Sequence, residues 1–258
     1  MKVLLLGATG RVGSRLLPAL VKHQHSVVVL VRSPNKLPPH ASSHIAATIT
    51  GSATDVATIK SAILDHNCDA VVNAAGLASM TSFGKQGDLT KIITAVAEAA
   101  AAAAKERGGP PLRCWFMSGW AMLDSPKPPA VIMDYAPLFP EHRKTFDVIK
   151  QYDAREQLTW SIFCASTLTP RFESASFPPA ESCSVDNLVA KADSPPAWSS
   201  SWSGVPLIGT YLNIFTQAGN YKTPLEDSAD FIAADLEKGL GSDFVGKRVG
   251  LKLKEKGI

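Results

Sequence analysis

Cysteine is scarce in this sequence, and its placement excludes two common uses. The 258 residues hold four cysteines and no Cys-x-x-Cys pair. A zinc ribbon needs such pairs, and disulfide scaffolds are usually far shorter chains with denser cysteine. We therefore expect no metal site, and reduced thiols or small core residues at Cys68, Cys114, Cys164 and Cys183.

Long hydrophobic runs and blocks of like charge are also missing. The alanine-rich stretch 93–109 is too short for a membrane span and carries Glu98, Lys105 and Glu106. The apolar start of the chain is too brief for a signal peptide and runs straight into a glycine motif, which favours a strand. The net charge of +3 is dispersed, with no Lys/Arg block among aromatics. These absences predict a cytoplasmic protein with neither membrane nor nucleic acid as partner.

Short apolar runs alternate with amphipathic segments through the first two thirds of the chain. Continuously apolar strands are buried on both faces, and their alternation with helices is typical of a parallel sheet. The fold class is therefore α/β, a doubly wound, mostly parallel Rossmann sheet. The predicted strands are 2–6, 26–31, 45–50, 68–76, 112–119 and 158–167, and the predicted helices are 10–22, 55–66, 88–107 and 141–157.

This alternation of apolar and amphipathic segments weakens after residue 120, which suggests that the chain has two parts with different functions. We expect a dinucleotide-binding domain at 1–166 and a small C-terminal, substrate-side segment at 167–258. In that segment, 170–206 shows no clean period. A helix capped by Asp227 or Ser228, followed by a strand at 247–253, is expected to return to the Rossmann core.

Three glycines at intervals of three predict a phosphate site. Gly7, Gly10 and Gly13 follow the first apolar run and open the first helix. Glycine there allows a tight turn and lets backbone N–H groups approach a pyrophosphate, which the helix N-terminus favours. The position between a buried strand and a helix gives the pattern its specificity. We expect a bound dinucleotide.

Acidic residues are absent before Asp55, and this charge pattern favours one dinucleotide over another. The basic residues that precede Asp55 are Lys2, Arg11, Arg15, Lys22, Arg32 and Lys36. NAD sites usually place a carboxylate at the end of the second strand, to bind the ribose 2′-hydroxyl. Arg32 stands there instead, with Lys36 nearby. A guanidinium can pair with a 2′-phosphate, which a carboxylate would repel. The predicted cofactor is NADP(H).

The motifs "GATGRVG", "VRSPNKL", "VVNAAG" and "LTWSIFCAST" resemble those of atypical short-chain dehydrogenase/reductases. Within them, the chain looks most like the NmrA-like and flavin-reductase-like branch. It is also similar to fungal oxidoreductases of aromatic-polyketide pathways, the averufin-oxidase-A type. The resemblance covers about residues 1–170 and a late helix, and it implies a role in fungal secondary metabolism.

The resemblance assigns cofactor contacts position by position. It implies a pyrophosphate loop, a 2′-phosphate ligand at Arg32, an adenine wall where the family usually has an acid, a ribose wall, and a nicotinamide end. Cys164–Thr167, including Ala165, replaces the family's Arg-Pro-Gly turn. The implied residues are Gly7, Thr9, Gly10, Arg11, Val12 and Gly13 for the loop, Ser52 and Ala53 for adenine, Ala74, Ala75 and Gly76 for ribose, and Ser118 and Ala165 for nicotinamide.

The Tyr-x-x-x-Lys pair of typical short-chain dehydrogenase/reductases is missing. Tyr135 is followed four residues on by Phe139, and Tyr152 by Glu156. A substrate-binding serine or another proton donor would have to stand in for the phenol. The candidates are Ser118, just past the fifth strand, and Tyr135, His142 and Lys144 in or after the proline-rich segment.

Aromatic residues in the second half suggest the substrate class. They could form a flat pocket for an aromatic molecule, or the core of the tail. The resulting hypothesis is an NADPH-dependent oxidoreductase acting on a small aromatic or polyketide-derived ketone or quinone. A nicotinamide-sensing regulator and a non-redox isomerase or dehydratase remain alternatives. The residues concerned are Met117, Trp120, Phe139, Phe172, Trp198, Trp202 and Tyr211.

Overall fold

A computed structural model describes residues 1–37, 40–77, 87–127, 129–153, 157–202 and 204–254. Its centre is an eight-stranded sheet with the order β3-β2-β1-β4-β5-β6-β10-β8. All neighbours are parallel except β10 and β8, which pair antiparallel. The strands are β1 (Lys2–Leu6), β2 (Ser26–Val31), β3 (Ile45–Thr50), β4 (Ala70–Asn73), β5 (Arg113–Gly119), β6 (Thr159–Ala165), β8 (Leu188–Ala192) and β10 (Lys247–Leu253).

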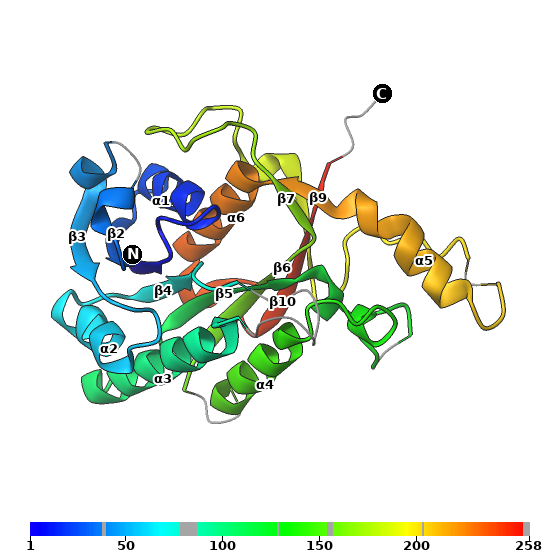
Figure 1. Cartoon of the computed structure of the whole chain (residues 1–258), viewed down its shortest axis with the longest axis horizontal. Helices are drawn as coiled ribbons and strands as arrows, with labels where there is room; N and C mark the ends of the chain where they lie inside the picture. Colours follow the sequence, from blue (N-terminus) through cyan, green and yellow to red (C-terminus); the bar gives the residue numbers. More distant parts are fainter. Residues whose placement is uncertain (38–39, 78–86, 128, 154–156, 203, 255–258) are drawn as a thin grey trace.

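Helices cover both faces of this sheet (Figure 1). On one side α1 (Gly13–Lys22) lies against α6 (Leu225–Glu237). On the other side α3 (Leu89–Arg107) packs between α2 (Val56–Asp65) and α4 (Glu141–Asp153). The apolar strands supply both interfaces: Leu4 and Leu6 of β1 belong to one core, and Val3 and Leu5 to the other. The doubly wound, mostly parallel α/β fold expected from the sequence is confirmed.

The segment after β6 adds smaller elements. Strands β7 (Thr167–Thr169) and β9 (Lys222–Pro224) form a separate parallel pair, and α5 (Gly209–Gln217) projects away from the main sheet (Figure 1). Short 3-10 turns occur both before and after β6. They occupy Pro34–Lys36, Ala41–His44, Trp120–Met122, Ile132–Asp134, Val185–Asn187, Ala218–Tyr221 and Gly239–Gly241.

Several boundaries differ from the sequence-based expectation. The first helix starts at Gly13, because residues 8–12 form the turn around the glycines. The late helix starts at Leu225 after Pro224, so Asp227 and Ser228 lie inside it and cap nothing. The stretch 170–206 contains a strand, β8, which the periodicity did not indicate. Its apolar positions are diluted by Lys191 because it lies at the edge of the sheet.

A buried ion pair fastens α6 to the centre of the sheet. The Arg113 guanidinium donates to Asp235 at 2.8 Å, and the indole of Trp115 donates to the same carboxylate at 3.0 Å. Ser242 also donates to Asp235, and Arg113 donates to Ser161 Oγ at 2.7 Å. Buried charges are retained only with such partners. The ion pair fixes α6, and through it α1, on the sheet.

Candidate functional site

The turn after β1 is built by glycines that leave no room for a side chain. Gly7 has φ +83°, and a Cβ there would lie 2.6 Å from the backbone of Ala74 at the end of β4. At Gly13 a Cβ would lie 2.1 Å from the carbonyl oxygen of Gly7. Gly10 closes the turn by donating its N–H to that oxygen at 2.9 Å. The start of α1 is thereby pressed onto the ends of β1 and β4.

The N-terminus of α1 is left available to an anion. No side chain caps the helix at Val12, and its first turn contains no acidic residue. Within the described part of the chain, the N–H groups of Arg11 and Val12 make no hydrogen bond. Free N–H groups and the positive end of the helix dipole together favour a phosphate.

A cleft of about 610 Å³ opens in front of this turn, within the range of roughly 300–1,000 Å³ typical of ligand pockets. Backbone from the ends of four neighbouring strands lines it, together with the start of α3. The lining residues are Gly7, Thr9, Gly10, Arg11, Val12, Leu30, Val31, Arg32, Gly51, Ser52, Ala53, Thr54, Ala74, Ala75, Gly76, Leu77, Asp88, Lys91 and Ile92. Its position at the carboxyl ends of the strands is where ligands of this fold class bind.

Arg32 lies on the cleft wall, whereas Lys36 does not. Arg32 follows β2 directly, is exposed, and has neither ion pair nor hydrogen bond within the described residues. Ser52 also lines the cleft. It lies in the turn after β3, where its hydroxyl contacts Thr54 Oγ1 at 2.8 Å. The nearby acid, Asp55, caps α2 by accepting the Thr58 N–H at 3.2 Å and is not part of the lining.

Most residues expected to bind the dinucleotide line this cleft, and four do not. Gly13 lies beneath the turn as a packing position. Lys36 is exposed in the turn after β2. Ser118 and Ala165 lie farther along the same sheet edge, at the carboxyl ends of β5 and β6, where Ser118 is paired with Cys164 and Gly119 with Ala165. Burial raises the pKa of the neighbouring Cys164 to about 12, so this thiol is not a nucleophile near neutral pH.

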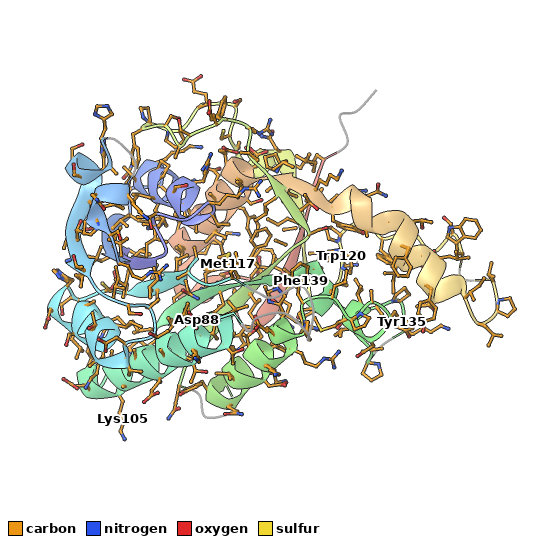
Figure 2. All side chains as sticks on the ribbon, viewed as in Figure 1. Asp88, Lys105, Met117, Trp120, Tyr135 and Phe139 are labelled. Atoms are coloured by element: carbon orange, nitrogen blue, oxygen red, sulfur yellow. The ribbon has the colours of Figure 1, made fainter. Side chains whose placement is uncertain are left out.

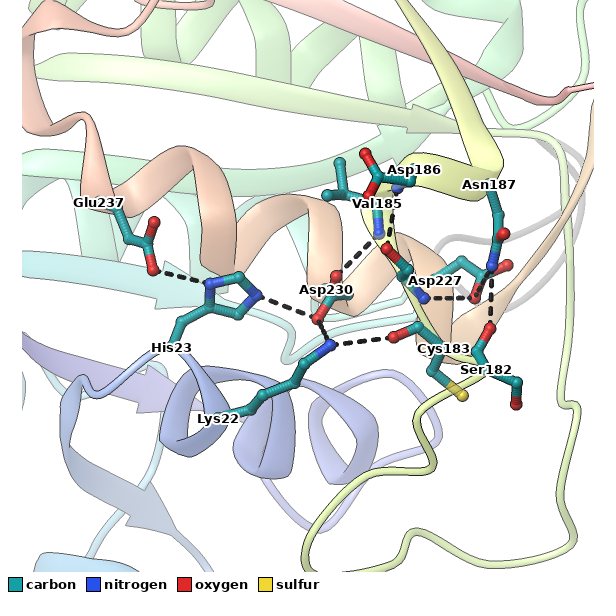
Figure 3. Close-up of polar contacts among 11 residues, drawn as sticks. Lys22, His23, Ser182, Cys183, Val185, Asp186, Asn187, Asp227, Asp230 and Glu237 are labelled. Carbon is teal, nitrogen blue, oxygen red and sulfur yellow. Dashed lines mark hydrogen bonds and ion pairs between the residues drawn. The ribbon is translucent and has the colours of Figure 1, made fainter.

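The basic residues of α1 turn out to have structural partners, which corrects the wider charge argument. Arg15 pairs with Glu226 at 3.5 Å and donates to the carbonyl oxygens of Phe172 and Glu173. Lys22 pairs with Asp230 at 2.8 Å and donates to Cys183 O at 3.0 Å (Figure 3). These charges therefore do not report on the cofactor.

Arg11 joins the cleft to the segment after β6. It lines the cleft, and its Nη2 donates to Leu168 O at 2.9 Å. Arg11, in the turn before α1, and Arg15 and Lys22, on α1, together donate to carbonyl groups within residues 168–183. We call residues 168–183 the flank. The flank is thus attached both to the turn around the glycines and to the helix that follows it.

The four proposed catalytic residues do not converge. The imidazole of His142, at the start of α4, lies against Gly119 next to Ser118: a Cβ at Gly119 would be 2.8 Å from His142 Cδ2. Tyr135 instead makes an edge-to-face contact with Tyr211 of α5, with ring centroids 5.4 Å apart. Lys144 is exposed on α4. Ser118 and His142 are therefore the pair that the fold brings to one edge.

The aromatic residues divide between core and surface. Trp120 is buried, stacks on Trp198 and also contacts the ring of Tyr221. Phe172, Trp202 and Tyr211 are exposed to about two fifths of their area, at 42%, 43% and 43%. Figure 2 shows Met117 and Phe139 near the middle of the molecule and Tyr135 farther out beneath α5. Only part of the aromatic set can therefore contact a substrate.

The start of α3 was missed by sequence reasoning. Asp88 and Lys91 line the cleft beside Ile92, and the two charged groups lie 3.9 Å apart. Figure 2 shows Asp88 at the beginning of this helix. A signal was present, because a helix that follows a parallel strand starts at the edge where that strand ends.

Two further findings bear on function. The described cysteines are buried free thiols. Among the described helices, none has both the length and the apolar character that crossing a bilayer requires.

Comparison with known proteins places the fold. A comparison with curated protein sequences gives no match. An NAD-dependent epimerase/dehydratase, so named provisionally, from Bacillus halodurans is 20% identical with a TM-score of 0.60, covering 99% of this chain and 95% of its own. A provisionally named NADH-flavin reductase from Streptococcus pneumoniae is 17% identical with a TM-score of 0.63, covering 98% and 100%. A short-chain dehydrogenase/reductase from Veillonella parvula, solved with NADP, is 13% identical with a TM-score of 0.59, covering 97% and 94%.

At these identities the three structures share the fold alone. The sequence pattern of the NAD(P)H-binding family, in contrast, matches residues 7–176. That range begins at the first glycine of the phosphate turn and includes every residue that lines the cleft. The chain belongs to the NAD(P)H-binding family.

Proposed function

We propose that this protein is an NADPH-dependent oxidoreductase that acts on a small aromatic ketone or quinone. Family membership supports a nicotinamide cofactor. The preference for the phosphorylated form rests on Arg32, the one observation that carries the proposal: it stands on the cleft wall where NAD-binding proteins usually hold a carboxylate.

The size and the chemistry of the cleft support this cofactor. Its volume lies in the usual range of ligand pockets, and the free N–H groups at the start of α1 suit a pyrophosphate. The exposed guanidinium of Arg32 suits the 2′-phosphate, and the backbone at residues 74–76 suits a ribose. When bound, NADPH supplies a hydride, and the protein's part is to bind, orient and exclude water.

The proposed substrate class rests on the residues beyond the cleft. Half-buried Met117, late in β5, and half-buried Phe139, whose ring centroid lies 6.0 Å from that of His142, offer apolar surface near the carboxyl edge of the sheet. Flat aromatic molecules bind well to such side chains. The resemblance to aromatic-polyketide oxidoreductases points the same way.

The cytoplasmic location stays a prediction.

The test measures NADPH and NADH binding by calorimetry for Arg32→Glu beside Lys36→Glu. The two variants make the same charge change, but only Arg32 is on the cleft wall. Loss of a charged hydrogen bond should weaken NADPH binding by roughly 10- to 100-fold in the Arg32 variant. NADH binding should change far less, and Lys36→Glu should leave NADPH binding nearly unchanged. Equal weakening of both nucleotides by Arg32→Glu would refute the 2′-phosphate assignment.

Turnover separates the three candidate functions. Protein and NADPH are mixed with a panel of quinones, flavins and aromatic ketones, and reduced-nicotinamide absorbance is followed. Consumption of NADPH supports the oxidoreductase. Tight binding of nucleotide with no consumption favours a nicotinamide-sensing regulator. A product formed without any change in the nicotinamide favours an isomerase or dehydratase.

A further inference from the structure

The first turn of α4 is held firmly in place. Glu141 is 8% exposed and accepts the N–H of Gly87, just before α3, at 2.9 Å. The buried Thr145 donates to the carbonyl oxygen of His142 at 2.9 Å, and the N–H of His142 donates to Phe139 O at 3.0 Å. These bonds fix the backbone at His142, so its imidazole has a defined place.

That place is directly over the last residue of β5. A Cβ at Gly119 would lie 2.8 Å from His142 Cδ2 and 3.1 Å from Nε2. The backbone of Gly119, with φ −96° and ψ 149°, is extended and would accept any residue. A side chain at this position would therefore meet the imidazole, while the backbone conformation itself does not call for glycine. The ring lies at the carboxyl edge of the sheet, against Gly119, the residue that follows Ser118.

The two ring nitrogens of His142 have different surroundings. Nδ1 is buried and has no hydrogen-bond partner among the described residues, which leaves Nε2 as the atom that can meet a ligand. Burial lowers the pKa of His142 to about 4, against a smaller opposing effect of Glu141. The imidazole is therefore neutral near pH 7. We assign its proton to Nε2, because the other tautomer would bury an unpaired N–H.

We propose that His142 Nε2–H binds the reacting oxygen of the substrate, in a chain that lacks the Tyr-x-x-x-Lys pair. This rests on the proposed function and names the group that acts on the substrate. A neutral imidazole held at a helix N-terminus can polarise a carbonyl, and the helix dipole favours the negative charge that develops on its oxygen.

Reduction of the substrate carbonyl forms one C–H bond and one O–H bond. The hydride adds to the carbonyl carbon, and the π-electron pair of the C=O bond moves onto the oxygen. The oxygen is stabilised by Nε2–H and takes its proton from water, and the hydroxide left behind is neutralised by a proton from the solvent. Ketone, NADPH and one proton thus give alcohol and NADP⁺. His142 is neutral before and after the step.

A chemical footprint tests this without turnover. The protein is treated with diethyl pyrocarbonate, which labels neutral imidazole, and the labelled histidines are identified by mass spectrometry. Labelling is compared for the free protein, with NADP⁺, and with adenosine 2′,5′-bisphosphate, which lacks nicotinamide. His66, at the end of α2, serves as the internal control. We expect NADP⁺ to protect His142 and the bisphosphate to leave it reactive.

The outcomes separate the two proposals. If calorimetry shows NADP⁺ binding while His142 labelling is unchanged, or if His142 is unreactive in the free protein, the assignment of His142 is wrong and the proposed function stands. If NADP⁺ does not bind, the proposed function fails as well.

Kinetics of an aromatic ketone that the panel identifies as a substrate gives the second readout. Removal of a hydrogen-bond donor to a developing oxyanion lowers kcat about 10²- to 10³-fold, which is the expectation for His142→Leu. His142→Gln, whose amide can still donate from a similar position, should recover much of this loss. Both variants should bind NADPH like the unchanged protein, and His66→Gln should keep its kcat. Equal kcat for His142→Leu and the unchanged protein would overturn the proposal.

Discussion

Gly13 is the first residue of α1 and Gly109 follows the end of α3, and an added methyl group would meet very different surroundings at the two positions. At Gly13 the new Cβ would lie 2.1 Å from Gly7 O, whereas nothing lies within 4 Å at Gly109. Overpacking against backbone costs roughly 1–3 kcal/mol. Gly13→Ala should therefore lower the free energy of unfolding by about that amount in urea denaturation. Gly109→Ala should leave it nearly unchanged, and equal effects would contradict this packing role.

Asp235 is the residue whose loss should be most damaging. Its neutralisation leaves the guanidinium of Arg113 buried without a counter-charge. Breaking a buried pair in this way typically costs about 3–5 kcal/mol. We expect Asp235→Asn to lose that much unfolding free energy, measured by chemical denaturation. Asp134→Asn breaks an exposed pair with Arg143 and should cost at most about 1 kcal/mol.

At the scale of elements, the contact between α1 and α6 contains a titrating group. His23 Nε2 contacts Asp230 at 3.0 Å and Nδ1 contacts Glu237 at 2.8 Å (Figure 3). Only an imidazolium can donate to both carboxylates. The hydrogen bond to Asp230 raises the pKa of His23; burial opposes it, and the hydrogen bond to Glu237 adds to it.

The sign of the resulting pH dependence follows from the raised pKa. The His23 contribution to stability is fully present below the unfolded pKa of about 6.5 and is lost as pH rises through the folded pKa. His23→Gln should therefore destabilise the protein more at pH 5.5 than at pH 8.5. Paired urea titrations at these two pH values check it. A constant difference between variant and unchanged protein would show that His23 is not charged in the folded state.

Local sequence patterns were sufficient to predict the elements whose burial is evident from their own residues. The strands at 2–6 and 26–31 are continuously apolar because both faces are covered, and their bounds were predicted correctly. Asp227 was misread as a cap because its role is long-range. It is buried inside α6, where it accepts from Arg171 and from the N–H of Ser184. No local pattern distinguishes these two uses of an aspartate.

The candidate site divides in the same way. The place of the glycine turn and of Arg32 on the cleft wall could be predicted because strand, turn and helix are adjacent in the sequence. The contact of His142 with Gly119 depends on where α4 lies relative to β5, which spacing does not give. The charge pattern of α1 misled for a related reason: Arg15 and Lys22 pair with α6, about two hundred residues later.

At the scale of the whole molecule, the cleft and the flank are parts of one unit. The turn at residues 7–13 leads into α1, and side chains of the turn and of α1 hold the flank. A nucleotide bound only by the folded protein should stabilise all of it. At a concentration of 100 times Kd, NADP⁺ should add about 2.7 kcal/mol to the unfolding free energy. Thermal shift measurements over a range of NADP⁺ concentrations check this, and an unchanged Tm at saturation would contradict it.

The place of β10 has a consequence for synthesis on the ribosome. This strand lies between β6 and β8, although it follows both in the sequence. A nascent chain that has reached residue 240 can already assemble the order β3-β2-β1-β4-β5-β6, while β6 still exposes an unpaired edge and β8 has no neighbour. Open edges of this kind invite pairing with other chains. Until β10 has been made, β6 therefore keeps the open edge at which pairing with another chain can begin.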